Sequence, residues 1–147
     1  MYWILLLNSN QCRIFSFSKK DQQLTLIQEI HHPENREKDS DLVSDGPGRY
    51  QSNGGGHGAY AQQTDPKQIK INQFMVEISH MLDEARKQQK FNELTVIASP
   101  KTHGELTQHL NKNVEKLIST VIQKDLVFLK QHELQDFLTK EQKNFRL

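Results

Sequence analysis

The chain has 147 residues, with 19 Lys and Arg against 18 Asp and Glu and a formal net charge of +1. This length suits a single domain spanning residues 1–147. A net charge this small excludes an overall electrostatic field that attracts nucleic acid or an anionic membrane. The single cysteine excludes an internal disulfide, and no apolar run approaches the length of a membrane span, about 20 residues, so we expect a cytoplasmic protein without such a span.

Three strands are predicted at the start of the chain. Residues 2–7 form a nearly continuous apolar run, which is typical of a strand covered on both faces. The polar residues 8–10 follow as a turn, in which an asparagine is expected to supply positive φ. Two further apolar runs, at 12–17 and 24–30, indicate strands as well. Their short connections predict an antiparallel meander.

The hydrophobic pattern stops between residues 33 and 66. This segment holds six of the seven glycines and three of the four prolines, with only a handful of apolar residues. Connections of this length without periodicity are uncommon in a compact domain and are usually functional or disordered. We therefore take the long loop at 33–66 as the candidate functional segment.

A strong amphipathic helix is predicted after the loop. Apolar residues recur from Ile71 at i, i+3, i+4, i+7, i+11 and i+14, which is a single stripe on one helical face. Asp65 is suited to the N-cap, and Pro66 to the first helical position. Gln68 then completes an Asp-x-x-Gln capping box.

The remaining elements complete an α/β (α+β) fold. The β-branched run 94–98 predicts a central parallel strand, and Ser99-Pro100 opens a helix. A short helical piece at 114–118 leads to a strand at 120–123, and a final helix begins near residue 131. The order is βββ-loop-αβααβα, which predicts one mixed five-stranded sheet packed by helices.

The glycine-rich tip of the loop is the candidate site for binding a partner. Glycines let a backbone approach a partner closely, and consecutive amides can cradle an anion. The spacing lacks the Lys-Ser/Thr of a nucleotide P-loop, which excludes that reading. His57 is the candidate catalytic residue, as a general base. The predicted tip consists of Gly54, Gly55, Gly56, His57 and Gly58.

The first half of the loop is predicted to anchor it to the domain. Leu42 supplies an apolar contact, and acidic and basic side chains around it can pair. A calcium loop is excluded, because Val43 stands where a ligand is required. Residues 33–50 are thus expected to pack on the sheet, and residues 52–58 to be mobile. The anchoring residues are Arg36, Asp39, Asp41, Leu42, Asp45 and Arg49.

The sequence predicts neither a metal site nor a cofactor. His31, His32 and His57 lack the Cys or Glu spacing of a zinc site, and surface histidines are the simpler interpretation. Cys12 lies in a predicted strand without a neighbouring base, so we expect a buried, unreactive thiol.

The segment 32–67 and the helix after it resemble the bacterial host-attachment protein family, described as "protein required for attachment to host cells". The pieces KDSDLVSD, PGR and TDPK are the specific part of the resemblance, which covers nearly the whole chain. That family is similar in fold to the middle domain of archaeal and eukaryotic class I release factors, a fold shared with certain ribosomal proteins. In release factors a Gly-Gly-Gln tip acts on peptidyl-tRNA, and here Gly56 stands in the place of the glutamine.

Three functional hypotheses follow. The resemblance implies an intracellular, release-factor-like module, non-catalytic or conditionally catalytic, that binds the ribosome or RNA through a degenerate glycine tip. The second hypothesis is a factor needed for attachment to host cells, acting indirectly or at the surface. The third is a hydrolase of peptidyl-tRNA or another ester, with His57 as general base and loop amides stabilising the oxyanion.

Overall fold

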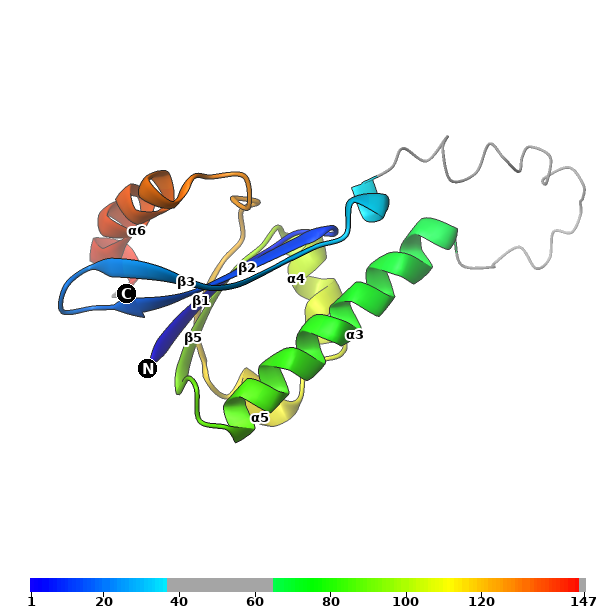
Figure 1. Ribbon diagram of the computed structural model, residues 1–147, viewed down its shortest axis with the longest axis horizontal. Coiled ribbons are helices and arrows are strands. Elements are labelled where there is room, and N and C mark those ends of the chain that lie inside the picture. The colour runs from blue at the N-terminus through cyan, green and yellow to red at the C-terminus, as the bar shows by residue number, and fades with distance from the viewer. Residues whose placement is uncertain (37–64, 146–147) are drawn as a thin grey trace, which may run out of the picture.

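The computed structural model describes residues 1–36 and 65–145, with the backbone alone at 34, 36 and 142–145 (Figure 1). Within these ranges a 3-10 turn, η1 (Pro33–Arg36), follows the third strand. The five strands are β1 (Tyr2–Leu7), β2 (Gln11–Ser18), β3 (Gln23–His31), β5 (Glu93–Ile97) and β6 (Ile118–Ile122). The helices are α3 (Pro66–Lys87), α4 (Pro100–Thr107), α5 (Lys112–Glu115) and α6 (Gln131–Phe145).

The strands form one mixed sheet in the order β3-β2-β1-β5-β6. β2 runs antiparallel to both β1 and β3, whereas β5 runs parallel to both β1 and β6. This arrangement confirms the predicted α+β fold and its element order. None of the helices in the described ranges is long and apolar enough to cross a membrane.

The central strand β1 is buried at all six positions, because helices cover both faces of the sheet (Figure 1). Trp3, Leu5 and Leu7 face a core formed with α3, α4 and α5. The alternate residues face a second core, which Leu134 and Leu138 of α6 complete. Successive side chains of a strand point to opposite faces, so a continuous apolar run is what a strand between two layers requires.

The predicted stripe of α3 is buried against the sheet, which confirms the helix and its orientation. Asp65 is the N-cap, and its Oδ1 accepts a hydrogen bond from the backbone nitrogen of Lys67 at 2.9 Å. The predicted capping box is wrong. The Gln68 amide nitrogen instead donates to Glu105 Oε2 of α4 at 3.1 Å and to Asn72 at 3.0 Å. Gln68 therefore joins two helices rather than closing a cap.

Two further local predictions are corrected. The turn after β1 uses no positive φ, since Gln22 and Gln89 are the non-glycine residues with that conformation in the described ranges. Asn8 makes the turn through its side chain, whose Oδ1 accepts from the backbone nitrogens of Asn10 and Gln11 at 3.0 and 2.8 Å. The helical piece ends at Glu115, and residue 118 already belongs to β6.

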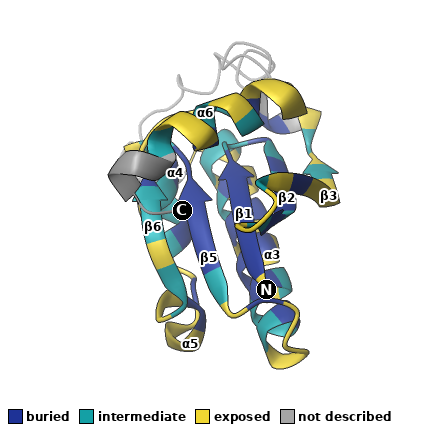
Figure 2. Cartoon of the chain, turned by 90° about the vertical axis from the view of Figure 1, so that its left-hand side faces the viewer, coloured by how far each residue is buried: buried dark blue, intermediate teal, exposed yellow. Residues whose placement is uncertain are grey.

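Four strands have their carboxyl ends on the same side of the sheet. We call this side, where the strands end, the carboxyl edge; it is not the edge formed by an outer strand. β5 and β6 are parallel to β1, and β3 has the same direction because both β1 and β3 oppose β2 (Figure 2). η1 follows the end of β3, and both α3 and α4 begin at this edge. The segment 37–64 therefore leaves and re-enters the described structure at the carboxyl edge (Figure 1).

Candidate functional site

The outgoing end of the long loop is held by hydrogen bonds to the turn between β1 and β2. The backbone nitrogen of His32 donates to Asn10 O at 2.7 Å, and that of Asn35 donates to His32 O at 2.9 Å. The side-chain nitrogen of Asn35 donates to Ser9 O at 3.0 Å. Asn35 is 2% exposed, so these bonds lie largely out of water, where they position the chain firmly.

The returning end of the loop is held by the first turn of α3. Asp65 caps the helix, and the bond from Gln68 to Glu105 ties its start to α4. α4 is capped in turn by Ser99, whose Oγ accepts from the backbone nitrogen of Thr102 at 3.2 Å. Hydrogen bonds thus fix the residues at both ends of the loop, and loops held on a rigid scaffold commonly carry function.

Two helix N-termini and charged side chains of both signs lie at this edge. The N-termini of α3 and α4 both open there, and neither helix has an acidic residue in its first turn. Helix N-termini carry partial positive charge and favour anions. Lys67 and Lys101 lie in the first turns of these helices, and Lys70 lies in the second turn of α3. The carboxylates of Asp65, the N-cap of α3, and of Glu105 lie at the same edge and offset part of this charge.

A cavity of about 230 Å³, which we call the stem cavity, lies between α3 and the end of β3. His32 Nε2 and Glu77 Oε1 are 2.9 Å apart across it. The His32 ring also packs edge-on against Phe74, with centroids 5.0 Å apart. The residues that line the stem cavity are His32, Asn35, Lys70, Gln73, Phe74 and Glu77.

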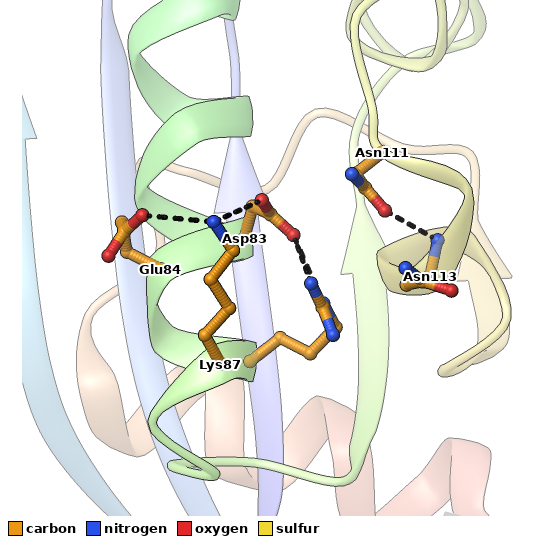
Figure 3. Close-up of polar contacts among 6 residues, drawn as sticks. Asp83, Glu84, Lys87, Asn111 and Asn113 are labelled. Carbon is orange, nitrogen blue, oxygen red and sulfur yellow. Dashed lines mark hydrogen bonds and ion pairs between the residues drawn. The ribbon is translucent and has the colours of Figure 1, made fainter.

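A second polar cluster lies near the other end of α3, beside a cavity of about 290 Å³ (Figure 3). Asp83 accepts a hydrogen bond from Arg86 at 2.8 Å and lies 3.6 Å from Lys87, which is itself 3.5 Å from Glu84. The hydrogen bond from Arg86, with the charges of Arg86 and Lys87, lowers the pKa of Asp83. Because these charges neutralise one another within the helix, the cluster serves the structure of α3.

Most of the site residues predicted from sequence lie outside the described ranges. These are the tip residues Gly54, Gly55, Gly56, His57 and Gly58 and the anchors Asp39, Asp41, Leu42, Asp45 and Arg49. Arg36 is described through its backbone, as the last residue of η1. The roles given to all of them stay predictions.

The histidines and the cysteine of the described ranges can be placed. His32 pairs with Glu77, and no group of three metal-ligating residues occurs in residues 1–36 and 65–145. Cys12 is buried, and its pKa is raised well above the ordinary thiol value, first by burial and then by the charge of Glu77. The expectation that the thiol is buried is confirmed, and the raised pKa disfavours the thiolate, which is the reactive form.

Sequence reasoning missed the stem cavity. The signal available in the sequence was the spacing of Lys70, Phe74 and Glu77, which places them on one face of a helix. No pattern in the sequence near α3 indicated that this helix face would line a cavity together with His32 and Asn35, which precede the long loop.

Comparison with known proteins identifies a family. A family model described as "Protein required for attachment to host cells" matches residues 3–138. The curated proteins give no match. Among solved structures, one described as "Archaeal protein" is similar to this chain with a TM-score of 0.47 and 9% identity. The similarity covers 97% of this chain, which spans only 37% of that one.

Proposed function

This chain belongs to the family of proteins required for attachment to host cells, and we propose that it acts as a cytoplasmic module that binds RNA, either free or within the ribosome. The loop tip at 54–58 is the proposed contact with the partner, presented by the carboxyl edge. The role in attachment is then indirect, through an intracellular partner.

The observation that carries this proposal is that two helix N-termini and three lysines lie together at the carboxyl edge. The lysines are Lys67, Lys70 and Lys101, and the acidic residues at the same edge are Asp65, the N-cap of α3, and Glu105. Phosphate groups are bound by this combination of helix N-termini and Lys side chains. A local patch of this kind supports contact with a polyanion even where net charge is near zero.

The described residues favour binding over catalysis. The cysteine is buried with a raised pKa, and His32 is engaged with Glu77 and Phe74. A hydrolytic role depends on His57, which lies outside the described ranges, and the glutamine of a release-factor tip is replaced by Gly56.

The proposal is tested by sedimentation of the tagged protein with ribosomes in sucrose gradients, together with ultraviolet cross-linking to RNA. We expect co-sedimentation at low salt that is lost as salt rises, because phosphate contacts release counterions. Replacing Gly54, Gly55 and Gly56 by Ala should reduce it, and so should the pair Lys70→Ala and Lys101→Ala. The pair Lys112→Ala and Lys116→Ala, in and just after α5, makes the same charge change far from this edge and should have no effect.

Two results would contradict the proposal. One is the absence of the protein from ribosomal fractions, and of any RNA cross-link, at every salt concentration. The other is strong labelling of the protein on intact cells by an impermeant reagent, which would instead favour a direct role at the surface.

A further inference from the structure

His32, just after β3, contacts α3 at the base of the long loop. Its Nε2 lies 2.9 Å from Glu77 Oε1, and its ring packs edge-on against the buried Phe74. Its backbone nitrogen donates to Asn10 O at 2.7 Å, so both the ring and the backbone are held in place. The side chain is nevertheless 34% exposed to solvent. A proton can therefore reach the ring without unfolding of the domain.

The charge of the stem cavity depends on the protonation of this ring. Lys70 and Glu77 line the cavity together with His32, and their opposite charges cancel. The three other lining residues have amide or aromatic side chains without charge. Histidine is the side chain that ordinarily changes its charge between about pH 5 and about pH 8. Acidification across this range therefore makes a neutral cavity positively charged.

The other described side chains around His32 do not oppose this change. The turn between β1 and β2 contributes the uncharged Asn10, and η1 contributes the uncharged Asn35. Burial raises the pKa of Cys12 on β2, which therefore stays uncharged over the same range. His31 precedes His32 in the chain and is exposed, and its protonation adds a further positive charge.

We propose that protonation of His32 strengthens RNA binding at the carboxyl edge. Lys70 belongs both to the stem cavity and to the lysines of the proposed RNA contact, so a phosphate held by Lys70 lies beside this cavity. A protonated ring compensates the charge of Glu77 and weakens its repulsion of that phosphate. The inference rests on the proposed RNA-binding function and adds to it a dependence on pH that His32 sets.

The test measures the affinity of the full-length protein for a short oligouridylate between about pH 5.5 and about pH 8, by fluorescence anisotropy at low salt. Neither uracil nor the phosphodiester changes its charge in this range, so the pH dependence belongs to the protein. In water, opposite unit charges about 6 Å apart change an affinity by about 3-fold. We therefore expect His32→Gln to reduce the gain in affinity on acidification by about 2-fold to 5-fold.

His32→Gln keeps an amide nitrogen that can donate to Glu77, but it binds no proton. The matched control is His109→Gln, which removes an exposed histidine from the connection between α4 and α5 and should leave the gain unchanged. In a Lys70→Ala background, His32→Gln should have a smaller effect, because the phosphate beside the cavity is no longer held. NMR spectra of the ring nitrogens should also show that added RNA raises the protonated fraction of His32 at constant pH, since binding and protonation are linked reciprocally.

The outcomes separate this inference from the function on which it rests. If RNA binds but His32→Gln shows the same gain on acidification as the unmodified protein, the inference is wrong and RNA binding stands. A loss of the gain that His109→Gln reproduces would mean that overall charge is responsible, and it would also overturn the inference. If no RNA binds at any salt concentration or pH, the proposed function fails, and the inference fails with it.

Discussion

The strands β1 and β3 both carry the apolar residues that predict a strand, yet they occupy opposite environments in the sheet. β1 is apolar throughout, whereas four of the nine residues of β3 are apolar. Every residue of β1 is buried, whereas seven of the nine residues of β3 are exposed. β1 pairs with β2 and β5, whereas β3 is the edge strand and pairs with β2 alone. Leu26 and Ile27 of β3 are 44% and 46% exposed. The comparison shows that an apolar run predicts a strand well and its burial poorly, because burial depends on what lies beside the strand.

The edge strand is protected at its start by α6 rather than by another strand. Gln131 donates its side-chain amide to Leu24 O at 2.9 Å, and Gln135 donates to Gln22 O at 2.6 Å. Unpaired backbone groups on an edge strand invite pairing with other chains, and covering them with a helix removes the hazard. The rest of β3 leads directly to η1 and the stem cavity.

Truncating the central strand should have the largest effect on stability. Leu5 is fully buried in the core between the sheet and α3. We expect Leu5→Ala to lower the free energy of unfolding by about 2–5 kcal/mol, through lost burial and the cavity left behind. Urea denaturation followed by circular dichroism measures this. A loss below about 1 kcal/mol would show that β1 is not the packed centre described here.

Alkaline pH should reveal the burial of the neighbouring strand β2 through Cys12. Burial, with a smaller contribution from the charge of Glu77, raises the pKa of this thiol in the folded protein. The unfolded chain ionises near its ordinary pKa of about 8.5 and then binds fewer protons than the folded protein, so stability falls as pH rises above that value. The loss should approach about 1.4 kcal/mol per pH unit.

The control is Cys12→Ala, which changes the overall stability but should remove this part of the slope. Denaturation of both proteins across the alkaline range separates the thiol from the lysines and tyrosines that titrate there too. Equal slopes for the two proteins would mean that the thiol is not buried in the native state.

The hydrogen bonds from α6 to the edge strand β3 should contribute less to the stability of the protein. Gln131→Ala removes the hydrogen bond to Leu24 O and should cost about 0.5–1.5 kcal/mol. It should also speed amide hydrogen exchange at the start of β3 while leaving β1 unchanged. His132→Ala, on the same helical turn and exposed, is the matched control and should change neither quantity. Faster exchange throughout β1 would contradict the local role given to Gln131.

The smallest effect is expected from the exposed apolar side chains of β3. Ile27→Ala should change the free energy of unfolding by only about 0.5 kcal/mol, because nearly half of the residue is already exposed to solvent in the folded protein and substitutions at the surface usually have effects of this size. Both variants are measured under the same conditions, and the difference between their losses of unfolding free energy expresses the contrast between the two strands. A loss as large as that of Leu5→Ala would show that another surface covers β3 in solution.

Much of the fold was predictable because its signals are local. The run at residues 2–7, the stripe beginning at Ile71 and the N-cap Asp65 all act within a few residues of where they stand. Periodicity of about 2 or 3.6 residues identifies such elements, and their order limits the possible sheets to a few. The failed capping box shows the limit, since Gln68 bonds instead to Glu105, 37 residues away.

The candidate site was predictable only as a segment. Composition singled out the loop at 33–66, but the predictions for its tip and anchors lie outside the described residues. The stem cavity joins His32, just after β3, and Asn35 of η1 to residues of α3 that follow only after the whole loop. No pattern within either stretch indicates the other.

The sequence by itself determined the elements of this protein, their order and the faces that α3 and β1 bury, since these follow from the spacing of apolar side chains along the chain. Only the tertiary structure decided that β3 is an exposed edge, that two helix N-termini and their lysines meet at the carboxyl edge, and that Asn35 faces α3. The physical reason is the distance along the sequence over which each kind of interaction acts. Propensity and periodicity act between neighbours in sequence, whereas burial, charge clustering and hydrogen bonding depend on which segments the sheet brings together.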